Sequence, residues 1–466
     1  MENSSPLRIA VVPTPGMGHL IPLVEFAKKL LHRHNFSSTF FLPNTGPLSD
    51  SQRSFLFALP PAIDYILLPP ITFDDYHGNI KPETRIALTI ARSVPLVRDA
   101  VLGSLNGGSN KFAAFVADMF AVDTLDVARE FNIPPYLFFP SSAMALSVFF
   151  HLPQLDKTVS CAYRDLPEKL QIPGCSVPIH GRDLFDPAQD RKNDAYKWIL
   201  HLANKFKTAP EGVIVNSFKE LEPGAFEALQ KKEKGKPEIY AIGPLIQSGS
   251  NSEVQNSDVC LNWLDEQPIS SVLLVSFGSG GTLSHAQITQ LALGLEMSGQ
   301  RFLWVIRCPS DKSPSGPENP LSYLPDKFLD RTKNRGLVVP MWAPQAQILA
   351  HVSTGAFLSH CGWNSTLETM VSGLALIAWP LDAEQKMNAV LLHEDVKVAL
   401  RPKVGEINGL VEKVEVCNLV KSLMEGEEGK GIRSRMRVLK EGAARALSCS
   451  PGLDDLAQKW KTHVAR

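Results

Sequence analysis

Short apolar runs alternate with amphipathic stretches along most of the chain, and this alternation constrains the fold more than any other feature. The N-terminal part has apolar runs that predict buried strands at 8–12, 38–42, 112–117, 136–139 and 212–216. Amphipathic segments that predict helices separate them, at 20–30, 85–102, 121–131, 143–152 and 195–207. Strands that alternate with helices in this way are typical of a parallel sheet covered by helices. The predicted class is therefore α/β.

The same pattern starts again after a polar, serine-rich segment at 247–258, which is the best linker candidate in the chain. Each half begins with a strand, a glycine-containing turn and a helix. In the second half these are followed by further strands at 302–306, 337–340, 356–358 and 374–379. We therefore predict two doubly wound, Rossmann-like domains that face a central cleft. Their predicted bounds are 1–246 and 259–448, with a terminal amphipathic helix in 449–466.

Composition excludes several classes of function. Lys and Arg total 47 and Asp and Glu total 48, so the formal net charge of −1 argues against a general binder of nucleic acid or anionic membrane. No run reaches the roughly 20 apolar residues of a membrane span, and the N-terminus lacks the apolar core of a signal peptide. Seven cysteines without metal-ligand spacing argue against a zinc site or a disulfide framework. We expect a cytoplasmic protein.

Polar and aromatic residues are concentrated in the stretch 342–385. A buried strand there ends in Ser-His-Cys-Gly-Trp-Asn-Ser at 359–365. A helix is predicted at 366–371, which Gly373 can stop. The next strand ends at Pro380, so polar residues follow two successive strands. Ligands of open α/β sheets bind beyond such strand ends, and a helix N-terminus beside a His and a Ser suits an anion such as a pyrophosphate.

Two glycine-containing turns follow the first strands of the two halves, at 16–18 and 278–281. A dinucleotide-binding fingerprint needs G-x-G-x-x-G and an acidic residue roughly 20 residues on. Neither turn has that spacing, and the strand at 38–42 is not followed by an acid, so NAD(P) binding is disfavoured. The glycines either let the backbone approach another ligand closely or only make tight turns.

Several of these motifs match one family. The pattern W-x-P-Q, H, H-C-G-W-N-S, E and E-Q across 342–385 resembles the signature box of plant family 1 UDP-glycosyltransferases. P-G-M-G-H at 15–19, the strand-ending Asp118 and F-G-S at 277–279 match the same family, so the resemblance covers essentially the whole chain. Segments such as PGMGHLIPLVEFAKKL and WPLDAEQKMNAVLL look especially like the branch that contains hydroquinone and monolignol glucosyltransferases. The resemblance implies the GT-B architecture. In that architecture the N-terminal domain mainly holds the acceptor, the C-terminal domain holds UDP-sugar, and the terminal helix packs back on the N-terminal domain.

The resemblance implies a catalytic pair in the N-terminal half. His19 would be the general base that takes the proton of an acceptor hydroxyl. The alternative is a turn histidine satisfied by backbone. Asp118 would bond the other ring nitrogen and stabilise the imidazolium, as the Asp of a serine-protease triad does. The alternative is an N-cap for the helix predicted at 121.

The resemblance also implies the residues that hold the donor. Trp342 would stack on uracil, and Glu368 would accept the ribose hydroxyls. As an alternative, Ser365-Thr-Leu-Glu368 is a capping-box pattern, so Glu368 would only cap its own helix. Gln385 points to glucose, whereas Asp382 is predicted to be a solvated loop residue. The implied donor-binding set is Ser279, Trp342, Ala343, Gln345, His360, Trp363, Asn364, Ser365, Glu368, Glu384 and Gln385.

Two residues depart from the family pattern, and the acceptor pocket is weakly defined. Ala375 stands where the family usually has proline, and Ala356 where glycine is common, so rigidity near the sugar is reduced while donor contacts remain. For the acceptor we name residues that are apolar or near a helix start, each with an ordinary core or solvated position as the alternative. They are Met17, Glu83, Ile86, Met119, Phe120, Phe149 and Leu184.

The sequence therefore predicts an inverting UDP-glucose-dependent glucosyltransferase that forms β-O-glucosides of small phenolic acceptors. No DxD motif for a metal–diphosphate complex is present, which agrees with the metal-free chemistry that the resemblance implies, and no cofactor is expected. The expected partners are the aromatic acceptor and the UDP-sugar, and the protein is expected to be a monomer. The alternatives are a GT-B transferase with a different sugar donor and a catalytically idle nucleotide-sugar binding protein.

Overall fold

The computed structural model describes residues 6–75, 80–107, 111–247, 256–311, 319–405 and 409–465. Internal contacts divide the chain into two compact units. Unit 1 comprises Met1–Arg182, Asp186–Gln247 and Ala446–Arg466, and unit 2 comprises Asp183–Phe185 and Ser248–Arg445. Most of the linker predicted at 247–258 lies outside the described residues.

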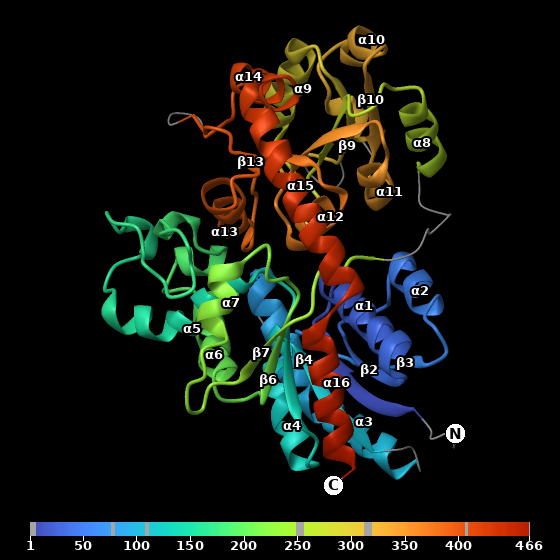
Figure 1. Ribbon diagram of the computed structural model, residues 1–466, viewed down its shortest axis with the longest axis vertical. Coiled ribbons are helices and arrows are strands. Elements are labelled where there is room, and N and C mark those ends of the chain that lie inside the picture. Colours follow the sequence, from blue (N-terminus) through green and yellow to red (C-terminus); the bar gives the residue numbers. More distant parts are fainter. Residues whose placement is uncertain are drawn as a thin grey trace. The chain divides into compact units, whose positions relative to one another are not determined.

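Unit 1 is built on a parallel sheet, as the alternating pattern predicted. Its strands lie in the order β3, β2, β1, β4, β5, β6, β7, and each neighbouring pair is parallel (Figure 1). The strands are β1 Leu7–Val12, β2 Phe36–Asn44, β3 Ile63–Pro70, β4 Phe112–Asp118, β5 Pro135–Phe139, β6 Gly212–Val215 and β7 Glu238–Ala241. The helices are α1 Met17–His34, α2 Asp50–Phe57, α3 Pro82–Asn106, α4 Leu125–Glu130, α5 Ala143–Thr158, α6 Asp194–Phe206, α7 Pro223–Leu229 and α16 Pro451–Val464.

Unit 1 contains elements that were not predicted, namely β3, β7, α2 and α7, and one predicted helix is divided. The edge strand β3 was not predicted, because it leaves Tyr65, Ile66 and Leu67 exposed and so lacks a buried pattern. The helix predicted at 121–131 is split into a 3₁₀ helix, η1 (Met119–Thr124), and α4. The backbone N–H of Phe120 donates to the Asp118 carboxylate at 3.3 Å, which caps this tighter first turn.

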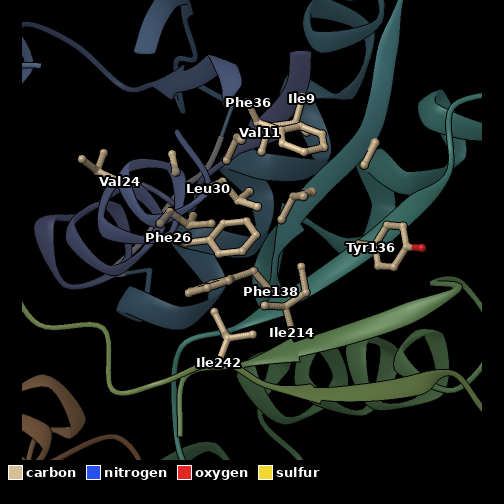
Figure 2. Packing of buried hydrophobic residues seen from close by; sticks show 14 of the residues in the cluster. Ile9, Val11, Val24, Phe26, Leu30, Phe36, Tyr136, Phe138, Ile214 and Ile242 are labelled. Atoms are coloured by element: carbon tan, nitrogen blue, oxygen red, sulfur yellow. The ribbon is translucent and has the colours of Figure 1, made fainter. Parts of the chain in front are cut away.

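The core of unit 1 includes the last helix of the chain. Figure 2 shows Phe26 of α1 packed toward Phe138 of β5 within this core. Trp460 of α16 is fully buried in the same cluster. The centroid of its ring lies 5.8 Å from that of Phe36 and 5.3 Å from that of Tyr136. Unit 1 is therefore completed by residues that follow the whole of unit 2 in the sequence.

Unit 2 repeats the same architecture. Its strands lie in the order β10, β9, β8, β11, β12, β13, again with parallel neighbours. The strands are β8 Val272–Ser276, β9 Arg301–Ile306, β10 Gly336–Pro340, β11 Thr354–Ser359, β12 Ala375–Ala378 and β13 Ala399–Leu400. The helices are α8 Ser257–Asp265, α9 His285–Ser298, α10 Phe328–Thr332, α11 Gln345–Ala350, α12 Trp363–Ser372, α13 Gln385–Val390, α14 Lys413–Met424 and most of α15 Glu427–Ser448. None of the helices in the described ranges is long and apolar enough to cross a membrane.

The helix after the central polar motif begins earlier than predicted. Gly362 is the N-cap of α12, so Asn364 and Ser365 lie in its first turn. Gly373 ends α12 in the left-handed conformation, with a φ of 78°, which confirms the predicted stop. Ala356 and Ala375, the two departures from the family pattern, are register partners on β11 and β12 and are fully buried.

Candidate active site

The strand order of each sheet reverses at one place, and three of the predicted site residues lie there. In unit 1 the reversal lies between β1 and β4, and in unit 2 it lies between β8 and β11. Open α/β sheets bind ligands at the carboxyl ends of the strands that flank such a switch point. His19 follows β1, and Asp118 ends β4. His360 follows β11, in the same way. Each unit therefore carries predicted site residues at its own switch point.

A histidine–aspartate pair occupies the switch point of unit 1. His19 lies in the first turn of α1, and its Nδ1 is 3.0 Å from Oδ2 of Asp118. The Asp118 side chain is fully buried, whereas the His19 side chain is 24% exposed. A carboxylate only accepts hydrogen bonds, so this contact fixes the tautomer that carries the proton on Nδ1. Nε2 is then the nitrogen that can take a proton.

The buried carboxylate has further partners, one of which the sequence did not indicate. Thr14 is buried, and its hydroxyl donates to Oδ1 of Asp118. The same oxygen accepts from the backbone N–H of Phe120, so Asp118 caps η1 and orients His19 at once. The capping contact therefore does not exclude the bond to His19 that the proposed role of Asp118 requires. Thr14 was missed because a threonine in a strand-ending turn has no periodicity that would mark it.

The acceptor candidates are only partly brought together. The Phe120 ring lies edge-on to the His19 ring, with centroids 5.7 Å apart. Phe149 is buried and stacks on Phe206 at 5.3 Å, which is a core position. Leu184 is fully buried and belongs to unit 2, whereas the other candidates belong to unit 1. Met119 is buried, and the remaining candidates are half-buried, namely Met17, Glu83 and Ile86.

In unit 2 the ring of His360 is held between two glycines. A Cβ placed on Gly278 or on Gly362 would lie 2.4 Å from its Nε2, so neither position has room for a side chain. Burial lowers the pKa of His360 to about 4, so the ring is neutral at neutral pH. Its Nδ1 is buried and has no hydrogen-bond partner within the residues that the structure describes. Such a ring can accept or share a proton when an anion binds beside it.

Gln345, Ser365 and Glu368 form one hydrogen-bonded group. The Gln345 side-chain amide donates to Oγ of Ser365 at 2.9 Å and to Oε2 of Glu368 at 2.7 Å. The capping-box alternative for Glu368 is wrong, because the N-cap of α12 is Gly362 and no side chain caps this helix. Burial raises the pKa of Glu368, and the bond from Gln345 opposes that shift. Glu368 therefore has a fixed orientation and is available to hydroxyl donors.

The aromatic platform at Trp342 is exposed but has a constrained backbone. The Trp342 side chain is 51% exposed, while Ala343 beside it is buried. The side-chain amide of Asn256 donates to the carbonyl of Trp342 at 2.7 Å and to that of Pro340 at 3.2 Å. Asn256 was missed in the sequence analysis, because the carbonyls that it bonds lie far along the chain. A large exposed aromatic face on a tied backbone suits stacking against a planar base.

The last polar cluster of unit 2 surrounds Gln385. Its side-chain oxygen accepts from the backbone N–H groups of Leu381 at 2.9 Å and Asp382 at 3.1 Å. Its amide group donates to the Asp382 carboxylate. The prediction of a solvated Asp382 is therefore wrong, because this side chain is half-buried and bonded. Glu384 precedes Gln385 as the residue before α13 and is half-buried.

The remaining donor candidates differ in exposure. Trp363 is buried in the first turn of α12, Asn364 beside it is half-buried, and Ser279 is exposed in the glycine-rich turn. Arg307, which follows β9, donates to three carbonyls of this turn and was missed by the sequence analysis. The sequence signal that could have identified Arg307 is a charged residue directly after an apolar strand, at the sheet edge where ligands bind. No group of three or more His, Cys, Asp or Glu side chains in the described ranges is arranged to hold a metal ion.

Comparisons with known proteins agree on one family. A sequence profile described as "UDP-glucoronosyl and UDP-glucosyl transferase" matches residues 249–430. A hydroquinone glucosyltransferase of Rauvolfia serpentina is 59% identical, with 98% of each chain covered. UDP-glycosyltransferase 72B1 of Arabidopsis thaliana is 54% identical, with 99% of this chain and 98% of that protein covered.

Solved structures give the same result. A UDP-glucosyltransferase of Polygonum tinctorium that is capable of glucosylating indoxyl, in complex with 3,4-dichloroaniline, has a TM-score of 0.92 and 51% identity. The comparison covers 98% of this chain and 99% of that one. UGT2 of Phytolacca americana, complexed with UDP-2-fluoro-glucose and pterostilbene, has a TM-score of 0.89 and 47% identity. There the coverage is 98% of this chain and 100% of the other.

Proposed function

The chain belongs to the family of UDP-dependent glucosyl- and glucuronosyltransferases, and from that premise we propose that it transfers glucose from UDP-glucose to a hydroxyl group of small phenols, with inversion at the anomeric carbon. It is a UDP-glycosyltransferase with the GT-B fold, as the likeness to solved plant enzymes confirms. The hydrogen-bonded pair of His19 and Asp118 is the observation that supports the proposed reaction.

The acceptor is activated at Nε2 of His19. Asp118 holds the Nδ1 proton, so Nε2 takes the proton of the phenolic hydroxyl as its oxygen attacks the anomeric carbon. The imidazolium that forms is stabilised by the buried carboxylate, whose negative charge is supported by the hydroxyl of Thr14. The new C–O bond forms on the face opposite UDP, and the bond from the anomeric carbon to the UDP oxygen breaks. An α-linked donor therefore gives a β-glucoside.

The donor is bound by unit 2. Trp342 stacks on the uracil ring, and Glu368, held by Gln345, accepts the ribose hydroxyls. His360 and the N-terminal turn of α12, with Asn364 and Ser365, meet the pyrophosphate and stabilise the charge that builds on departing UDP. Glu384 and Gln385 meet the sugar. The chemistry needs only hydrogen-bond donors and one base, so we propose that it proceeds without metal or cofactor.

The acceptor class follows from the relatives and the pocket chemistry. The Rauvolfia relative is a hydroquinone glucosyltransferase, and the Phytolacca enzyme was solved with pterostilbene, so both point to hydroxylated aromatic acceptors. The ring of Phe120 lies against His19, where an aromatic acceptor can pack beside the base. The Polygonum enzyme was solved with an aromatic amine, which suggests that nitrogen acceptors should be included in a test.

The test is a donor and acceptor panel with product identification. Purified protein is incubated with UDP-glucose and mixed simple phenols, phenylpropanoids, flavonoids and hydroxyindoles, with and without a metal chelator. We expect phenolic β-glucosides, identified by the proton coupling at the anomeric carbon, and no effect of the chelator. A clear preference for another sugar nucleotide would sink the glucose assignment. Tight binding of UDP-glucose without turnover of any acceptor would favour the binding-protein alternative.

A variant of His19 tests the mechanism separately. With a phenol that is protonated at the assay pH, His19→Ala is expected to lower kcat by about 10²–10⁴-fold, the usual contribution of a general base. With an aromatic thiol that is already ionised, the same variant should keep most of its activity, because no proton has to be removed. Equal losses on both acceptors would argue that His19 has a structural role only.

A further inference from the structure

The side chain of Arg307 contacts the glycine-rich turn that follows β8. It comes directly after β9, the neighbour of β8 in the sheet, so it reaches the turn at the same edge. Its Nη1 lies 2.7 Å from the carbonyl oxygen of Ser279, 3.0 Å from that of Gly281 and 3.4 Å from that of Gly278. One guanidinium nitrogen thus gathers three carbonyl groups of a single turn.

This arrangement orients the N–H groups of the turn. The C=O and N–H of a trans peptide unit point in opposite directions. Carbonyls of residues 278, 279 and 281 that point toward Arg307 turn the N–H groups of Ser279, Gly280 and Thr282 away from it. The structure records no intramolecular acceptor for these N–H groups among the residues that it describes. Successive N–H groups that share one side of a turn form an anion-binding concavity.

The neighbours of the turn are residues of unit 2 that lie among those proposed to hold the donor. Gly278 lies against the ring of His360, where a Cβ would come within 2.4 Å of Nε2. Gly281 lies against Leu381 and Asp382, the residues that Gln385 holds. A Cβ on Gly280 would meet nothing within 4 Å, so that part of the turn has open space before it. The orphan N–H groups therefore belong to a turn bordered by the proposed pyrophosphate and sugar residues.

We propose that Arg307 is a positioning residue that holds the turn 278–281 in the form that binds the diphosphate of the donor. It acts through the backbone of the turn, and the turn contacts the ligand. A guanidinium suits this role, because its charge is permanent and its rigid plane fixes the directions of the N–H bonds of Nη1. An ammonium on a flexible stem carries the same charge, but its N–H bonds rotate and do not hold the carbonyls in a fixed geometry. The inference rests on the proposed function, since it takes a nucleoside diphosphate as the ligand.

The test compares a ligand that has the diphosphate with one that lacks it. Dissociation constants for UDP and for uridine are measured by calorimetry on the wild-type protein and on Arg307→Met. We expect UDP to bind at least about tenfold more weakly to the variant, the equivalent of one charge-assisted hydrogen bond, and uridine to bind as before. With UDP-glucose the KM should rise. Arg307→Lys should give an intermediate UDP affinity and unchanged uridine binding.

A matched control removes a different guanidinium–carbonyl bond of unit 2. Arg433 is half-buried on α15 and donates to the carbonyl of Leu423 at 2.7 Å, so Arg433→Met should leave both dissociation constants unchanged. Circular dichroism checks the fold of each variant. If Arg307→Met is unfolded, Arg307→Lys carries the test, and a wild-type UDP affinity for it would overturn the proposal.

The outcomes separate this proposal from the proposed function. If the wild-type protein does not bind UDP, the proposed function fails, and the role of Arg307 fails with it. If the wild type binds UDP and Arg307→Met binds it equally well, only the role of Arg307 is overturned. A variant whose affinities for UDP and for uridine fall by the same factor also overturns it. Such an effect would come from the contacts to the nucleoside or from the fold, and not from the diphosphate.

Discussion

Replacing Gly362 with alanine tests how tightly His360 is held. Gly362 has a φ of −59°, which any residue can adopt, so the substitution costs no backbone strain. The added Cβ would lie 2.4 Å from Nε2 of His360 and 3.1 Å from its Cε1. Non-bonded heavy atoms rest at about 3.5–4.0 Å, so the ring has to move by about 1 Å. On its other side the ring lies beside Gly278, where an added Cβ would also be 2.4 Å from Nε2, so a side chain at either glycine would meet the ring.

The substitution should lower both the stability of the fold and the activity, and different measurements report these two effects. Forcing an extra carbon into a close-packed site typically costs about 1–3 kcal/mol, so the free energy of unfolding should fall by that amount. Replacing glycine with alanine at the N-cap of α12 should lower the free energy of unfolding by about 0.5 kcal/mol more. A displacement of about 1 Å also disturbs the groups that meet the pyrophosphate, and errors of that size can cost about 100-fold in rate. We therefore expect weaker UDP binding and a lower kcat.

Urea unfolding of a set of variants measures the loss of stability, and calorimetry with UDP measures the loss of affinity. Gly280→Ala is the matched control for unfolding, because its Cβ meets nothing within 4 Å. In a His360→Ala background the clash is absent, so Gly362→Ala should cost only the N-cap part there. The double-mutant cycle should then show a coupling of about 1–3 kcal/mol between the two positions. Additive effects, or a Gly362→Ala protein with wild-type stability and UDP affinity, would refute the account of a clamped ring.

Three further predictions concern the pH dependence, the dyad and the core. Burial lowers the pKa of His360 from 6.5 to about 4, so the unfolded chain binds a proton in that interval and the folded chain does not. Stability should therefore fall by up to about 3 kcal/mol as the pH drops from about 6.5 to 4, and His360→Ala should remove that part of the slope in urea unfolding. Thr14→Val removes the hydroxyl that donates to Asp118 and should lower kcat on protonated phenols by about tenfold, with an unchanged KM for UDP-glucose in steady-state kinetics. Trp460→Ala empties a fully buried site and should lower the free energy of unfolding by about 3–5 kcal/mol in urea titrations.

The parts of the fold that bury apolar faces were predictable from the sequence. Strands such as β1, β4 and β8 are apolar along their length because both faces of a parallel sheet are covered. Their carboxyl ends could then be located, and the strand order places the polar residues after β1, β4 and β11 at the two switch points. The topology itself, with the reversal of strand order, is decided by packing between distant elements.

The misses depend on contacts that the apolar pattern of the sequence does not record. The segment Ser365–Glu368 looks like a capping box, but Gln345 from another helix takes the carboxylate instead. Asp382 looks like a loop acid, but the amide of Gln385 bonds it. Strand β3 pairs along the backbone while its side chains stay exposed, so no apolar pattern records it. An apolar pattern carries no information on these hydrogen bonds.

The place of Trp460 in the core of unit 1 has a consequence for biosynthesis. The cluster that contains Phe26 and Leu245 also needs Leu453 and Trp460, which leave the ribosome roughly 200 residues later. At synthesis rates of about 5–20 residues per second, the nascent unit 1 waits about 10–40 s with the site of the last helix open. The strands of unit 2, from β8 to β13, emerge within that interval. The second unit of the chain is thus the one that can complete its core first during translation.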